Sequence, residues 1–212
     1  MINFSVSSSR TPPTASSHHI FCPSLNGLKL PQCDLAYVMP RMNHNRLIRE
    51  TEGSSKWAGL LAGDPFGSEQ SFFQSLKQIG YKGVVNWPSS ILLDGYLRQA
   101  ISSIPISPSS EYLFLQRAKL AGFEVMAFFK SLDQGKIAVD AGLDKLILHP
   151  GILDHEPTSN SMLLGSLQRI IDSLKTQNSF LTILIYTSDW HQKMLSLNSL
   201  DTDGSVTCEL AQ

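Results

Sequence analysis

The hydrophobic and polar positions of this chain repeat one arrangement between residues 56 and 186. A segment with apolar residues at helical spacing ends at a glycine, as at Gly80, Gly122 and Gly142, and an apolar residue, a charged residue and a short apolar run follow. Glycine just past a helix adopts the left-handed conformation that ends it. Unbroken apolar runs are typical of strands buried on both faces. The pattern therefore predicts an α/β protein with a parallel sheet.

The same pattern gives the expected positions of the individual elements. Strands are expected at residues 58–63, 83–88, 125–129, 145–149 and 181–186, and a further strand could lie at 34–39. Helices are expected at residues 68–79, 111–121, 133–141 and 162–176, and residues 41–52 form a helix or a loop.

Both ends of the chain lack this pattern. Residues 1–33 contain no Asp or Glu and are rich in Ser, Thr and Pro, so we expect a disordered segment or an organelle transit peptide there. Residues 34–55 are expected to be a poorly defined lead-in, residues 56–190 the main domain, and residues 191–212 a poorly ordered tail. If residues 1–33 are not a transit peptide, a cytoplasmic location is expected.

Charge and composition exclude several classes of function. The formal net charge is -1 and no basic stripe occurs, so nucleic acid is not an expected partner. The longest apolar runs, such as residues 181–186, are far shorter than the roughly 20 residues that cross a bilayer, so no membrane association is expected. Three cysteines without a C-x-x-C spacing argue against a disulfide framework and a zinc knuckle.

The number of predicted strands limits the architecture. A closed (β/α)₈ barrel needs eight strand–helix units, and the patterned segment provides five or six strands. The residues alone leave two architectures open, an incomplete TIM barrel and an open doubly wound sheet. An incomplete barrel would expose apolar edges, so we expect it to form a homo-oligomer.

Candidate chemistry lies where the predicted strands end, because ligands bind there in both architectures. These positions carry Asp64, Asn86, Lys130, His149 and the group Thr187–Ser188–Asp189, with Asp94 on the loop after the Asn86 strand. Oxygen ligands suit Mg²⁺, helix N-termini suit anions, and histidine suits proton transfer. The alternative for each residue is structural: Asp64 and Asp94 in turns, Asn86 in a corner, and His149 in a hydrogen-bonded wall.

Several of these segments, taken in order, form a recognisable series. Residues 58–66 read AGLLAGDPF and residues 80–88 read GYKGVVNWP; Leu93–Gly95 with Arg98, Glu111, and residues 141–144 followed by His149 and Gly151 continue the series. The series resembles the phosphoenolpyruvate hydrolase-like TIM-barrel family, whose motifs include A-G-V-x-A-T-D-P-F and G-F-x-G-V-x-N-F-P. That family also forms the C-terminal domain of plant tobamovirus-resistance proteins. The resemblance covers residues 56–186.

The resemblance implies a TIM barrel with its pocket at the strand ends, a divalent metal, and reactions at C–C, C–O or C–P bonds of small oxoacids. By position, Asp64 would bind the metal and act in catalysis, and His149 would transfer protons. Asn86 and Asp94 would bind the substrate. The predicted function is therefore metal-assisted lyase or hydrolase chemistry on a small phosphorylated or keto acid, with Mg²⁺ as the expected metal.

The chain also departs from the family. The glycine-rich opening strand is missing or scrambled before Lys56, the histidine and glycines of C-H-G-G-P are replaced at residues 184–188, and the closing G-F-Y-G-A-S-S is absent. A second hypothesis is therefore a non-catalytic barrel remnant that acts as an interaction or resistance-type module. A third is an unrelated open α/β domain with a small-molecule pocket.

Overall fold

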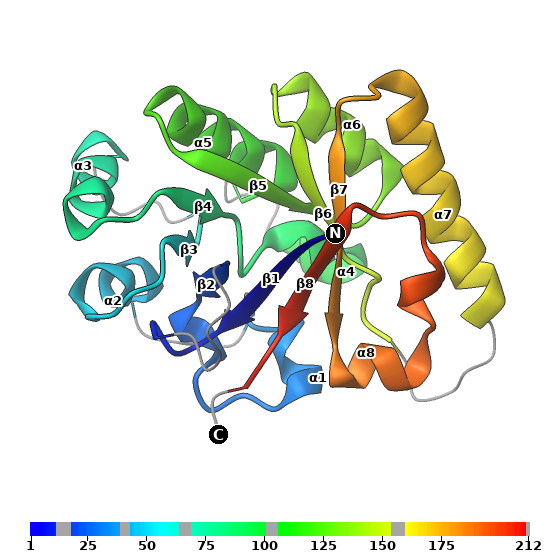
Figure 1. Cartoon of the computed structure of the whole chain (residues 1–212), viewed down its shortest axis with the longest axis horizontal. Helices are drawn as coiled ribbons and strands as arrows, with labels where there is room; N and C mark the ends of the chain where they lie inside the picture. The colour runs from blue at the N-terminus through cyan, green and yellow to red at the C-terminus, as the bar shows by residue number, and fades with distance from the viewer. Residues whose placement is uncertain (12–17, 39–42, 64–68, 101–105, 154–159, 211–212) are drawn as a thin grey trace.

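The computed structural model describes residues 1–11, 18–38, 43–63, 69–100, 106–153 and 160–210. Eight parallel strands follow one another in chain order and close into a barrel, because the last strand pairs with the first (Figure 1). The strands are β1 Ile2–Ser7, β2 His19–Phe21, β3 Trp57–Gly59, β4 Gly83–Val85, β5 Glu124–Phe129, β6 Lys145–Leu148, β7 Thr182–Ser188 and β8 Gly204–Cys208. The TIM-barrel class expected from the sequence is confirmed.

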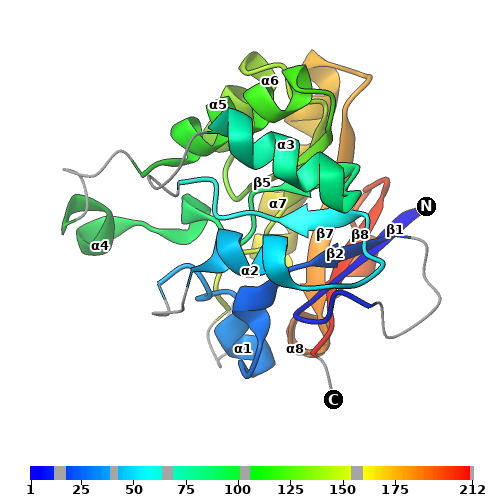
Figure 2. The ribbon, with the colours of Figure 1, turned by 90° about the vertical axis from the view of Figure 1, so that its left-hand side faces the viewer.

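Helices surround the barrel, and short ones gather at its carboxyl end. They are α1 Leu30–Cys33, α2 His44–Glu50, α3 Glu69–Ile79, α4 Gly95–Ala100, α5 Pro108–Leu120, α6 Leu132–Asp140, α7 Asn160–Gln177 and α8 Asp189–Met194. Consecutive outer helices α5, α6 and α7 pack side by side. Figure 2 shows α1 and α8 at the same end of the molecule, where these two helices touch.

The elements predicted between residues 69 and 186 are confirmed, with ends that differ by a few residues. Gly80, Gly122 and Gly142 have φ values of +96°, +91° and +78°, so each ends a helix in the left-handed region as the sequence predicted. Helix α5 begins earlier than expected, since the Ser107 hydroxyl accepts a hydrogen bond from the Ser110 amide and caps it. The predicted N-cap Ser68 lies outside the described residues.

The strand residues alternate between two hydrophobic cores. Val85, Phe128 and Ile147 pack inside the barrel, whereas their neighbours Val84 and Phe129 pack outward against the helices. This alternation is the period of two that β geometry imposes. The unbroken apolar runs in the sequence follow from it, because both faces of each strand are covered.

The expectation of an incomplete barrel was wrong, and so was the expectation that both chain ends are unstructured. Strands β1 and β2 lie within residues 1–33, and α8 and β8 lie within residues 191–212. Strands β1 and β8 carry serine, asparagine and threonine, and β2 has only three residues, so no long apolar run marked any of them. Closure pairs β1 with β8, so each of these two strands has a hydrogen-bonded neighbour on both sides.

Two further expectations change with the closed barrel. The strand expected at residues 34–39 is not formed by its described part, since α1 ends at Cys33 and turns follow up to Val38. We expected a homo-oligomer because an incomplete barrel would have an open strand edge. The closed strand ladder has no such edge. Across the described ranges, every helix is too short or too polar to span a lipid bilayer.

Candidate active site

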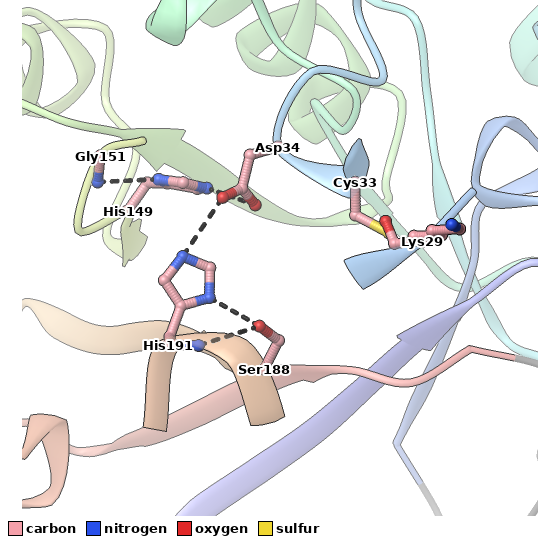
Figure 3. A network of polar contacts seen from close by, with 7 residues as sticks. All are labelled: Lys29, Cys33, Asp34, His149, Gly151, Ser188 and His191. Atoms are coloured by element: carbon pink, nitrogen blue, oxygen red, sulfur yellow. Dashed lines mark hydrogen bonds and ion pairs between the residues drawn. The ribbon is translucent and has the colours of Figure 1, made fainter. Parts of the chain in front are cut away.

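A carboxylate and two imidazoles meet at the carboxyl end of the barrel (Figure 3). Asp34 follows α1, His149 follows β6, and His191 lies in α8 directly after β7. One oxygen of Asp34, Oδ1, lies 3.4 Å from His149 Nε2, and its other oxygen, Oδ2, lies 3.3 Å from His191 Nε2. The three side chains are 2% exposed or less. Contact between α1 and α8 brings these residues, distant in sequence, into one cluster.

The second nitrogen of each ring is held by a nearby group. The Gly151 backbone N–H donates to His149 Nδ1 at 3.0 Å, so that nitrogen carries the lone pair. The neutral His149 ring must therefore hold its proton on Nε2, which faces Asp34. Ser188 Oγ lies 2.7 Å from His191 Nδ1 and also accepts the His191 backbone N–H, which caps α8. Each ring is therefore held in position at Nδ1, the nitrogen on the side away from Asp34.

The environment keeps Asp34 ionised and His149 neutral. Burial alone would raise the pKa of Asp34, but the two neighbouring imidazoles outweigh it and lower the pKa to about 2. Burial lowers the pKa of His149, and Asp34 opposes this shift only in part. At neutral pH the cluster is a buried carboxylate that faces the Nε2–H of His149.

The facing atoms of the cluster are poorly satisfied. Three buried atoms lack a hydrogen bond of good geometry in the described structure: Asp34 Oδ1, His149 Nε2 and His191 Nε2. The two distances between the histidines and Asp34 exceed the usual donor–acceptor range of about 2.7–3.2 Å. The indole nitrogen of Trp87, whose ring stacks on His149 at 5.4 Å between centroids, is also without a partner there. Buried polar atoms normally have partners, so this concentration of unpaired atoms indicates a ligand site.

A cavity of about 170 Å³ opens beside Asp34. Three segments line it, with the residues Asp34, Leu35, Tyr37, Val38, Ser89, Leu92, Leu93, Asp94 and Ile152. It is smaller than the pockets of about 300–1,000 Å³ that hold drug-sized ligands, so it suits a small group. A larger hollow of about 740 Å³ lies along β1 and β8 and includes none of the three cluster residues.

The structure places the predicted site residues in different surroundings. It brings His149 into the cluster. Asp94 is at the rim of the cavity, with 77% of its side chain exposed and its carboxylate 2.9 Å from Lys130 Nζ. The predicted catalytic and metal-binding residue Asp64 lies outside the described residues. The roles predicted for Asp64, Asp94 and His149 remain predictions.

The predicted substrate-binding residue Asn86 has its whole amide engaged within the protein. It is completely buried, and its nitrogen donates to Ser89 Oγ at 3.1 Å and to Glu111 Oε2 at 2.7 Å. Its oxygen accepts the Phe128 backbone N–H at 2.7 Å. These contacts match the structural alternative, in which Asn86 shapes the corner after β4, and its contact with substrate remains a prediction.

Two members of the cluster were missed in the sequence. His191 lies two residues beyond the group Thr187–Ser188–Asp189, and a helix start directly after the last predicted strand was the available signal. Asp34 had no such signal, because it sits between a short helix and a turn, and only the packing of α1 on α8 brings it to the site.

The cluster has the residue types of a metal site, with ligand atoms all within 4.8 Å of one another. Two imidazoles and one carboxylate suit zinc or iron better than Mg²⁺, which prefers oxygen. A metal-bound imidazole normally donates its other N–H to an acceptor. His149 does the opposite, since its Nδ1 accepts from Gly151. Its Nε2 therefore carries a proton and offers no lone pair, so the cluster as folded does not fit a metal.

The closed parallel barrel defines this chain as a TIM-barrel protein, with a polar cluster at the carboxyl end of its strands. A family model described as phosphoenolpyruvate hydrolase-like matches residues 21–182, most of the chain. The chain belongs to this family, which confirms the resemblance found in the sequence.

Two relatives match about 60% of this chain. An uncharacterised protein, y4oT, of Sinorhizobium fredii is 30% identical over 132 residues, which are 59% of this chain and 67% of the relative. The ToMV resistance protein Tm-1 of Solanum lycopersicum is 28% identical over 129 residues, which are 61% of this chain but 17% of Tm-1.

Solved structures are similar at a lower level. A candidate phosphonomutase of Burkholderia cenocepacia has a TM-score of 0.49 and 10% identity, with 96% of this chain and 85% of the other covered. A KDPGal structure has a TM-score of 0.43 and 13% identity, with 97% and 82% covered. Similarity at this level carries no argument about function.

Proposed function

We propose that this chain is an enzyme that carries out lyase or hydrolase chemistry on a small organic acid, with Asp34 as the group that accepts a proton from the substrate. One observation carries the proposal: a buried, ionised carboxylate, with one oxygen that lacks a hydrogen bond of good geometry, lies beside a cavity at the carboxyl end of a closed barrel. Asp34 is the only member of the cluster among the residues that line this cavity.

In this proposal Asp34 is the catalytic residue, and the two histidines position it. The Nε2 atoms of His149 and His191 lie against its two oxygens, so both rings hold the carboxylate in place and stabilise its charge. Removal of a proton from a hydroxyl group begins a lyase reaction, and removal from a water molecule begins hydrolysis. The proton moves to Asp34, which lies beside the His149 Nε2–H.

The family description supports a phosphorylated or keto acid as the substrate. The acidic group of such a molecule would lie toward the rim, where Lys130 reaches Asp94, because the described lining of the cavity contains no lysine or arginine. The reacting end would then point inward to Asp34. This orientation supports the small keto acid over the phosphorylated one, since a phosphate needs more cationic partners.

Magnesium at Asp64 stays part of the proposal as a separate prediction. Turnover that rises with added Mg²⁺ in the wild-type chain, and no longer does so in Asp64→Asn, would support it. Turnover unaffected by both Mg²⁺ and a chelator would refute it.

The second hypothesis, a barrel without catalysis, draws on one observation, the partial similarity to a protein named for virus resistance. The closed strand ladder removes one reason for it, the incomplete barrel, but the histidine and glycines of C-H-G-G-P are still replaced at residues 184–188. The two hypotheses differ in whether the purified chain turns over any small acid.

The test is turnover of a panel of small keto and phosphorylated acids by the wild-type chain, Asp34→Asn and Asp94→Asn. We expect Asp34→Asn to lower kcat/KM about 100-fold or more, as is typical of a lost general base. Asp94→Asn removes an exposed carboxylate and should have a much smaller effect. Equal turnover by the wild type and Asp34→Asn would refute the assignment of Asp34, and a folded wild type without turnover would favour the non-catalytic barrel.

A further inference from the structure

The walls of the cavity restrict which part of a ligand can enter it. We propose that the cavity takes an uncharged or cationic group that carries an O–H or N–H donor on an apolar body, and that it rejects carboxylates and phosphates. This selectivity rests on the proposed function only in placing the ligand beside Asp34. It concerns the inner end of the ligand, so it is compatible with an acidic group that remains outside at the rim.

The first argument is the need for a hydrogen-bond donor. Asp34 is 4% exposed and lines the cavity, and its Oδ1 has no hydrogen bond of good geometry in the described structure. The nearest donor to this oxygen, His149 Nε2–H, stands 3.4 Å away, so a ligand that brings an O–H or N–H at a shorter distance reduces the cost of the buried charge. Hydrogen bonds to a charged acceptor are also stronger than those between neutral groups.

The second argument is charge. Asp34 and Asp94 both line the cavity as carboxylates, and the lysine that pairs with Asp94 stands at the rim. The described lining includes neither lysine nor arginine. An anion inside would therefore face Asp34 at short range in a poorly solvated space, where like charges repel strongly. A neutral or cationic group meets no such repulsion.

The third argument is the apolar surface of the walls. Leu35, Val38 and Ile152 line the cavity and are 38%, 44% and 54% exposed, and Leu92 and Leu93 complete the apolar lining. Exposed apolar side chains around a small cavity are typical of a surface that a ligand covers. The volume of about 170 Å³ is similar to that of an apolar cavity of about 150 Å³ that binds benzene in another protein, so one ring fits.

The experiment uses four compounds with the same ring and different head groups: benzyl alcohol, benzylamine, toluene and benzoate. Binding to the full chain is measured by ligand-observed NMR titration at pH 7 without phosphate. We expect benzyl alcohol and benzylamine to bind about tenfold more tightly than toluene, the gain of one hydrogen bond to a charged acceptor. Benzoate should bind more weakly than toluene.

Three variants connect the result to the cavity. Asp34→Asn should remove the advantage of benzylamine, whereas Asp144→Asn, an exposed carboxylate that does not line the cavity, should keep it. Ile152→Ser removes apolar lining without adding charge at a half-exposed position, so it spares folding, and it should weaken all three ligands that bind.

Tighter binding of either donor compound than of toluene, lost in Asp34→Asn, would support the proposal. If benzoate binds as tightly as benzylamine, or if none of the four compounds binds to the folded chain, the proposal is wrong. The proposed function is judged separately by the turnover of the acid panel. Failure here with Asp34-dependent turnover intact would refute only this selectivity.

Discussion

Two buried polar clusters lie at the carboxyl end of this barrel, and they differ in how well their atoms are paired. In the first, Glu111 accepts hydrogen bonds from Asn86 Nδ2, Ser89 Oγ and the Ser90 backbone N–H at 2.5–2.7 Å. In the second, the facing atoms of Asp34, His149 and His191 stand 3.3–3.4 Å apart without good hydrogen bonds. Full pairing is typical of a structural network, and incomplete pairing beside a cavity is typical of a reactive one.

Burial and charge alone therefore do not mark a functional site. Glu111 is completely buried, and burial raises its pKa while hydrogen bonds from Ser89 and Ser90 oppose the shift. Such a carboxylate would rank as a functional candidate if its partners were ignored. Its partners instead fix the loop after β4, which carries Trp87 against His149.

The largest effect on stability is expected at the paired cluster. Glu111→Ala would leave Asn86, Ser89 and the Ser90 amide buried without their acceptor, which costs about 3 kcal/mol or more of the free energy of unfolding. Urea denaturation measures the loss. Glu111→Gln retains the size and one oxygen acceptor, so it should cost less. Equal, small losses in both variants would show that the network contributes little.

A change in pH should act on the unpaired cluster through His149. Burial lowers its pKa in the folded state, so below about pH 6.5, the value for an unfolded histidine, the unfolded chain binds the proton more readily. Stability is therefore full above that pH and is lost as the pH falls toward the folded pKa, by up to about 1.4 kcal/mol per pH unit.

The check is thermal unfolding between pH 7 and pH 5 for the wild type and His149→Gln. The variant should show a smaller loss on acidification. Burial also lowers the pKa of His19, which lies elsewhere in the barrel, so some loss will remain. A pH dependence that is identical in both proteins would contradict a neutral, buried His149.

A smaller effect is expected at Gly151, whose amide fixes the His149 ring. Its φ is +96°, and a side chain there would meet no atom of the described residues within 4 Å, so the expected cost of Gly151→Ala is backbone strain of about 1 kcal/mol. If the strain moves the amide away from Nδ1, the pH dependence of stability should change as well. A variant as stable as the wild type, with the same pH dependence, would show that this turn does not constrain His149.

No effect is expected from zinc at the unpaired cluster. Because His149 presents a protonated Nε2, neither added Zn²⁺ nor a chelator should shift the thermal midpoint by mass action at this position. A rise in the thermal midpoint with Zn²⁺ would contradict this if it disappears in His149→Gln but not in His18→Gln, a control at an exposed histidine. Such a result would show that His149 gives up its Nε2 proton and that the cluster binds the metal.

The sequence predicted the barrel where the strands are apolar on both faces, and it predicted His149 because it directly follows such a strand. It failed for β1 and β8, whose polar residues depend on the pairing that closure provides, and for β2, which has only three residues. Asp34 and His191 lie on or beside helices too short to leave a pattern, and α1 meets α8 only in the folded chain. Chemistry that depends on such packing cannot be read from spacing.

The central claim is that the unpaired cluster reacts and the paired cluster only supports the fold. The most direct measurement compares turnover of the acid panel and unfolding free energy in Asp34→Asn and Glu111→Gln, two isosteric changes. We expect Asp34→Asn to lose about 100-fold or more of its turnover even where it is fully folded, whereas Glu111→Gln loses stability and keeps turnover while folded. The reverse pattern, or turnover lost equally in both, would contradict it.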